Sequence, residues 1–176
     1  MKNNIAFLYS NDHSLSCKIA KEVSDQMKID TYIVENRAAL MMTEDGLLKE
    51  FIIKEFGKES YDDNGNFNTS VFMGMESSDS PGLDRLQDKM NSLIIDELKS
   101  LDKYTLVISN QLIETGILYL SKHLIVCEFK NVKEYDEYVN INSIKNIGSY
   151  YIKPDGTAAM VLALRGCLIE CWNYLS

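Results

Sequence analysis

The chain has 176 residues, of which 45% are hydrophobic and 25% charged, with two prolines and nine glycines. These proportions describe one folded domain and exclude a disordered chain, a collagen and a small disulfide scaffold. Acidic residues outnumber basic ones by 26 to 18, and the formal net charge of -8 argues against nucleic acid and anionic membranes as partners. Only Arg37, Arg85 and Arg165 are arginines, the side chain that commonly grips phosphate through two nitrogens.

The cysteines and the first residues both indicate a cytoplasmic protein. Cys17, Cys127, Cys167 and Cys171 form no CxxC pair, so we expect free thiols in a reducing compartment. The apolar run that ends at Tyr9 is too short for the hydrophobic region of a signal peptide. No stretch reaches the roughly 18 apolar residues of a membrane span. We therefore predict a cytoplasmic location without a membrane partner, and the oligomeric state stays open.

Short apolar runs alternate with longer segments of helical periodicity. The runs with the length and the β-branched or aromatic content of buried strands are residues 5–9, 31–34, 104–109 and 124–129. The segments that repeat apolar residues at helical spacing are residues 16–27, 47–56, 83–101 and 157–175. Strands that alternate with helices predict a mostly parallel sheet with right-handed crossovers, in a three-layer α/β/α domain that spans residues 1–176.

Two polar stretches predict irregular structure. Residues 62–66, with the sequence Asp-Asp-Asn-Gly-Asn, predict a solvated turn because their spacing does not fit a calcium-binding loop. Residues 76–82, which include Pro81, predict a loop. The two histidines, His13 and His123, lie far apart in the sequence without a spaced cysteine partner, so we predict no metal site.

The loop after the first predicted strand has the position of an anion site. In an open parallel sheet, ligands bind beyond the carboxyl ends of the strands, where free N–H groups of the next helix attract anions. Ser10, Ser14, Ser16 and Lys18 are the residues of this loop that could contact a phosphate. The loop contains no glycine, and a leucine, a serine and a cysteine stand where a P-loop, or Walker A motif, has its lysine and hydroxyl residue. The usual grip for a nucleoside triphosphate is therefore missing.

Several segments, taken in order along the chain, resemble dephospho-CoA kinases. Residues 31–42 and 47–59 are similar to the family's second strand and following helices, in which an acidic residue ends the strand and a Phe-Gly step closes a helix. Residues 63–72, 104–116 and 151–157 resemble its asparagine turn, its glutamate-containing motif after a strand, and its closing strand with the final helix. The resemblance implies a P-loop-kinase-like fold, ATP and magnesium as cofactors, and a nucleotide or dephospho-CoA as the bound small molecule.

The same resemblance gives roles to individual residues. Glu35 falls at the position of the family's aspartate base, and Arg37 and Glu114 fall on the substrate-binding side. The departures concern the reaction itself: the P-loop lysine is missing, Thr69 replaces an arginine, and a reduced lid around 130–150 has no arginine. Because phosphoryl transfer depends on positioning and charge neutralisation, we expect weak activity at best.

Four hypotheses follow. The first is a dephospho-CoA-kinase-like protein with impaired catalysis that retains at most a nucleotide or CoA-type ligand pocket. The second is an active kinase in which Lys18 or Lys21 replaces the missing lysine and Ser16 holds magnesium. The third is a flavodoxin-like FMN binder, whose hydroxyl-rich loop would hold the flavin phosphate. The fourth is a non-enzymatic interaction module, for which Trp172 and Tyr174 near the C-terminus would offer contacts.

Overall fold

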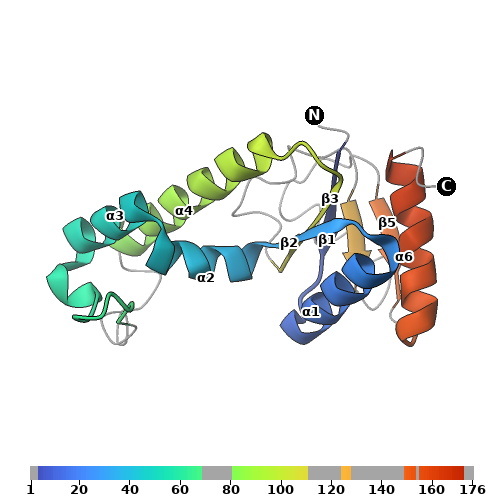
Figure 1. Ribbon diagram of the computed structural model, residues 1–176, viewed down its shortest axis with the longest axis horizontal. Coiled ribbons are helices and arrows are strands. Elements are labelled where there is room, and N and C mark those ends of the chain that lie inside the picture. Colours follow the sequence, from blue (N-terminus) through green and yellow to red (C-terminus); the bar gives the residue numbers. More distant parts are fainter. Residues whose placement is uncertain (1–3, 69–80, 111–123, 128–148, 154, 173–176) are drawn as a thin grey trace.

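The computed structural model describes residues 4–68, 81–110, 124–127, 149–153 and 155–172 (Figure 1). The strands form one sheet in the order β2-β3-β1-β4-β5, and all neighbouring pairs are parallel. Their bounds are Ile5–Tyr9 for β1, Asp30–Ile33 for β2, Thr105–Ser109 for β3, Leu124–Cys127 for β4 and Ser149–Ile152 for β5. The predicted α/β class with a parallel sheet is thus confirmed.

In the described part of the chain, one α-helix follows β1, three α-helices lie between β2 and β3, and one follows β5. Their bounds are His13–Glu22 for α1, Val34–Glu44 for α2, Gly46–Phe56 for α3, Pro81–Ser100 for α4 and Thr157–Trp172 for α6. A π-helical segment, Val23–Met27, continues α1, and a short 3-10 helix, Lys58–Ser60, follows α3. Within the described part of the chain, no helix combines the length and the apolarity that crossing a membrane requires.

Helices cover both faces of the sheet and make the three predicted layers. Successive residues of a strand point to opposite faces. Ile5, Phe7 and Tyr9 of β1 therefore pack into one buried cluster with α2, α3 and α4. Ala6 and Leu8 pack into a second cluster with α1 and α6. The central strand is buried on both faces, which explains why its sequence is a continuous apolar run.

Helices α2, α3 and α4 pack on one another and form what we call the helical arm. Figure 1 shows α3 well to one side of the sheet. Helix α2 runs from the sheet toward α3, and α4 runs back toward the sheet. Met41 of α2, Leu48 and Ile52 of α3, and Leu86 and Ile94 of α4 share one buried cluster. The core of the arm is therefore continuous with the core on one face of the sheet.

Two element boundaries differ from the sequence prediction in ways that affect the site. Strand β2 ends at Ile33 and Val34 begins α2, so Glu35 lies in the first turn of a helix and not at the end of a strand. Helix α1 begins at His13, three residues earlier than predicted, because the Asp12 carboxylate caps it.

The polar stretches behave as predicted in part. The turn at residues 62–66 is confirmed: Asp62 Oδ1 accepts hydrogen bonds from the N–H groups of Asn64 and Asn66, and Gly65 has a φ of +80°. The predicted loop at 76–82 is wrong at its end, because Pro81 begins α4, and proline suits the first turn of a helix.

The strand order separates this fold from a flavodoxin. A flavodoxin-like sheet has the order 2-1-3-4-5, which places its first strand beside its second. Here β3 lies between β2 and β1. The topology therefore contradicts the flavodoxin-like hypothesis.

Candidate functional site

The carboxyl ends of β1 and β3 lie side by side and gather polar residues. Ser10 follows β1, and its N–H donates to the carbonyl of Ser109, the last residue of β3, over 3.1 Å. Both serines are fully buried. Glu35, in the first turn of α2, accepts through Oε1 from Ser109 Oγ at 2.8 Å and from the Asn110 N–H at 2.9 Å. We call Ser10, Glu35, Ser109 and Asn110 the edge site, since ligands bind at this edge of parallel sheets.

The Glu35 side chain is half-buried, and its two carboxylate oxygens differ in their contacts. Oε1 takes both hydrogen bonds from the end of β3, whereas Oε2 accepts none from the described residues. A carboxylate held in this way can accept a hydrogen bond from a ligand hydroxyl through the other oxygen. Sequence reasoning identified Ser10 and Glu35 but missed Ser109 and Asn110, although their place directly after a buried strand was a usable signal.

The loop between β1 and α1 is short and contains a negatively charged side chain, Asp12. Only three residues separate Tyr9, at the end of β1, from His13, at the start of α1. Asp12 Oδ1 accepts from the Leu15 N–H over 3.2 Å. The N–H groups at a helix start are the groups that would hold a phosphate. Here one of them is already engaged, and the Asp12 charge repels a second anion.

The predicted phosphate contacts of this loop divide into two pairs. Ser10 Oγ and Ser16 Oγ both donate to the Asp12 carbonyl, over 3.3 and 3.0 Å, and both side chains are buried. Ser14 and Lys18 lie exposed on α1. The buried hydroxyls therefore stabilise the loop itself, and the role of all four residues in phosphate binding stays a prediction.

His13 and Cys17 form a pair that the sequence analysis overlooked. They lie one helical turn apart on α1, both exposed, with Cys17 Sγ 3.6 Å from His13 Nε2. The four-residue spacing was visible in the sequence, but the predicted helix began too late to include His13. Two ligands are fewer than a structural zinc site needs. Among the described residues, no three His, Cys, Asp or Glu gather in a way that could hold a metal ion.

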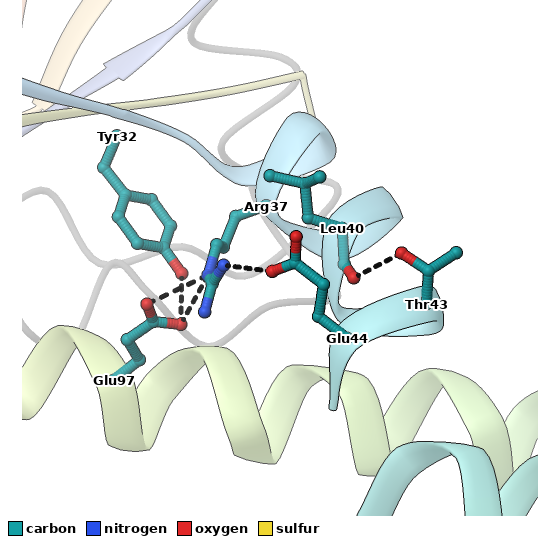
Figure 2. A network of polar contacts seen from close by, with 6 residues as sticks. All are labelled: Tyr32, Arg37, Leu40, Thr43, Glu44 and Glu97. Carbon is teal, nitrogen blue, oxygen red and sulfur yellow. Dashed lines mark hydrogen bonds and ion pairs between the residues drawn. The ribbon is translucent and has the colours of Figure 1, made fainter. Parts of the chain in front are cut away.

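Arg37 faces away from Glu35, because residues two apart on a helix do not share a side. Its Nε donates to both carboxylate oxygens of Glu97 on α4, over 3.0 and 3.1 Å. The Tyr32 hydroxyl donates to the same carboxylate over 3.2 Å, and Glu44 lies 3.7 Å from Arg37 Nη1. Figure 2 shows Tyr32 and Arg37 converging on Glu97. The structure thus does not bring Glu35 and Arg37, two predicted site residues, to one place.

The surroundings of Tyr32 and Arg37 favour the protonated forms of these two side chains. Burial, and then the Glu97 carboxylate, raise the pKa of Tyr32 well above its ordinary value. The hydrogen bond to Glu97 raises the pKa of the Arg37 guanidinium. Tyr32 is therefore a hydrogen-bond donor, and Arg37 a cation, throughout the physiological range.

Other predicted site residues lie outside the described residues. These are Glu114, Thr69 and most of the predicted lid at 130–150. The last two positions of that range, Ser149 and Tyr150, belong to β5, and the lid itself stays a prediction.

The sheet order and the helices on both faces define a three-layer α/β domain with a helical arm. A solved structure described as a dephospho-CoA kinase from Campylobacter jejuni has a similar architecture, with a TM-score of 0.66 and 14% sequence identity. The similarity covers 98% of this chain and 98% of that chain. No protein-family model matches the sequence, and no curated protein matches it. At this identity the likeness confirms the predicted fold.

Proposed function

We propose that the chain is a dephospho-CoA-kinase-like protein that has lost phosphoryl transfer and retains an acceptor-side pocket at the edge site. The structural likeness over the full length of both chains supports the kinase-like ancestry. The single observation that carries the proposed loss is the Asp12 cap on α1. A nucleotide or dephospho-CoA is the proposed ligand.

The donor side lacks the parts that neutralise a triphosphate. The loop is three residues long and has no glycine, so its backbone cannot approach a phosphate closely from several sides. The Asp12 carboxylate bonds the Leu15 N–H in the place where a phosphate would bind. Phosphoryl transfer without a cradle or a lysine loses most of its charge stabilisation.

The acceptor side retains an oriented carboxylate. Ser109 Oγ and the Asn110 N–H fix Oε1 of Glu35, and Oε2 is left to accept from a ligand hydroxyl. In the kinase family the corresponding acid serves as the base for the ribose hydroxyl. On this proposal Glu35 keeps the hydrogen bond to that hydroxyl while the transfer step is absent.

The active-kinase hypothesis and the interaction-module hypothesis receive less support. Lys18 and Lys21 lie on α1 after its first turn, and Lys21 is about 12 Å along the axis from the helix start, too far to reach a phosphate held there.

Trp172 is buried, with its ring edge-on to Tyr104 at 5.3 Å between centroids, so it is a core residue and not a docking contact. Tyr174 lies outside the described residues.

Calorimetric titration of the full chain tests the proposal. We expect dephospho-CoA to bind and ATP with magnesium not to bind. Glu35→Gln should weaken dephospho-CoA binding about tenfold, the usual effect of losing a hydrogen bond to a charged group. Glu50→Gln, a matched change at an exposed position of α3, should leave it unchanged. Tight ATP binding, or dephospho-CoA binding that Glu35→Gln does not alter, would contradict the proposal.

A further inference from the structure

Three elements meet at the base of the helical arm. Tyr32 lies on β2, Arg37 on the first half of α2, and Glu97 near the end of α4. Glu97 is 65 residues from Tyr32 and 60 from Arg37 along the chain, and its carboxylate accepts from both (Figure 2). Helix α2 leads from the sheet into the arm and α4 leads back, so this one carboxylate ties both connections to a strand.

The contacts have the chemistry of a strong and specific link. The Arg37 Nε proton is shared between the two Glu97 oxygens, at 3.0 and 3.1 Å. Charge-assisted hydrogen bonds of this kind exceed neutral ones in strength. The side chains of Arg37 and Glu97 are 36% and 31% exposed, so water screens the pair only in part. Tyr32 adds a neutral donor from the sheet.

A second arginine pair in the same arm provides a comparison. Arg85 of α4 binds Glu55 of α3 through two parallel hydrogen bonds of 3.1 and 2.7 Å. This pair is more exposed at its arginine, 56%, and joins two helices of the arm without involving a strand. It can therefore stabilise the arm internally but cannot fix the arm relative to the sheet.

We propose that Tyr32, Arg37 and Glu97 form a latch that holds the helical arm in one orientation against the sheet. Arms of enzymes that close over a substrate turn at the ends of their elements. In this chain those ends are the junction of β2 with α2 and the connection from α4 to β3, and the latch bridges the two. The orientation of the arm is thus set before any ligand binds. The latch gives Arg37 a positioning role, which does not depend on the proposed function.

Hydrogen exchange of the full chain, read by mass spectrometry on peptides, tests the latch. Glu97→Gln should speed exchange about tenfold in α2 and in the second half of α4, because local opening no longer breaks charge-assisted bonds. Exchange in β1 and α6 should not change. Glu55→Gln, the matched control, should leave α2 unchanged. Tyr32→Phe should give a weaker form of the Glu97→Gln pattern, which keeps the test usable if Glu97→Gln folds poorly.

A double substitution separates a latch from two independent stabilising residues. Arg37→Met and Glu97→Gln together should accelerate exchange in α2 by clearly less than the product of the two single factors, because both remove the Arg37–Glu97 interaction. Arg37→Lys, which keeps the charge but loses the Nε–H group, should resemble Arg37→Met. Factors that multiply in the double variant, acceleration spread evenly over the molecule, or no acceleration in α2 would overturn the latch.

Discussion

Two of the three arginines of this chain bind carboxylates of the chain itself. Arg37 is held by Glu97 and Arg85 by Glu55, both within the helical arm. Arg165 lies exposed on α6. The scarcity of arginine in the composition thus has a structural counterpart, because both arginines of the helical arm are engaged by carboxylates of the chain.

Ser109 orients Glu35, which gives a prediction at the edge site. Ser109→Ala leaves Glu35 Oε1 with only the Asn110 N–H and should lower the free energy of unfolding by about 1–2 kcal/mol. Urea unfolding measures this change. Ser100→Ala is the control, since the exposed Ser100 hydroxyl only bonds the Glu97 carbonyl of its own helix. An equal decrease in the free energy of unfolding for the two substitutions would show that the hydrogen bond from Ser109 to Glu35 adds no stability.

The cysteines should differ in reactivity. Burial raises the pKa of Cys171 to about 12, and burial also raises the pKa of Cys167, whereas Cys17 is exposed. Since the thiolate is the reactive form, an alkylating reagent near neutral pH should modify Cys17 well before Cys171. Mass spectrometry of the labelled peptides gives the order. Early labelling of Cys171 in the folded protein would contradict the burial described here.

At the scale of elements, the Asp12 carboxylate both caps α1 and places a negative charge at its start. Asp12→Ala removes the acceptor of the Leu15 N–H and should cost about 1 kcal/mol of stability, the usual value for an N-cap. Asp45 caps α3 through the Leu48 N–H at 2.9 Å, so Asp45→Ala should cost a similar amount. Chemical denaturation of both variants, with the exposed Asp25→Ala as control, checks the pair. An unchanged free energy of unfolding in Asp12→Ala would mean that the Asp12 carboxylate does not cap α1 in solution.

The edge site shows how far sequence reasoning reached. The apolar runs predicted β1 to β4, because buried parallel strands have little alternation, whereas β5 was expected only from the family resemblance. Glu35 was identified by resemblance, but its partners come from a strand about 75 residues further on, and no local pattern encodes that contact. Arg37 was assigned to substrate binding by the resemblance, and its contact with Glu97 depends on how α2 packs against α4, which the sequence does not show. The pairing with Glu97 is a tertiary contact that only the packing of the arm determines.

For the whole molecule, the raised pKa values of the half-buried Tyr150 and the buried Cys171 predict sensitivity to alkali. Burial raises the pKa of Tyr150 and of Cys171 to about 12, from ordinary values of 10.0 and 9.0. A raised folded-state pKa means that stability is full below the ordinary value and is lost as pH rises toward the folded value. The free energy of unfolding should therefore fall between about pH 9 and 12.

Thermal or urea unfolding across this range measures the loss. Cys171→Ala should delay its onset toward the ordinary tyrosine pKa of 10.0, whereas Cys17→Ala should not change the shape of the curve. A free energy of unfolding that stays constant from pH 9 to about 11 would show that these groups are not buried as described.

We propose above that this chain has lost phosphoryl transfer at the β1–α1 loop. The most direct measurement incubates the purified full chain with ATP, magnesium and dephospho-CoA and quantifies CoA and ADP by mass spectrometry. We predict no product above that of a control without protein. Repeated turnover that disappears in Lys18→Ala would contradict the claim and show that α1 supplies the missing lysine.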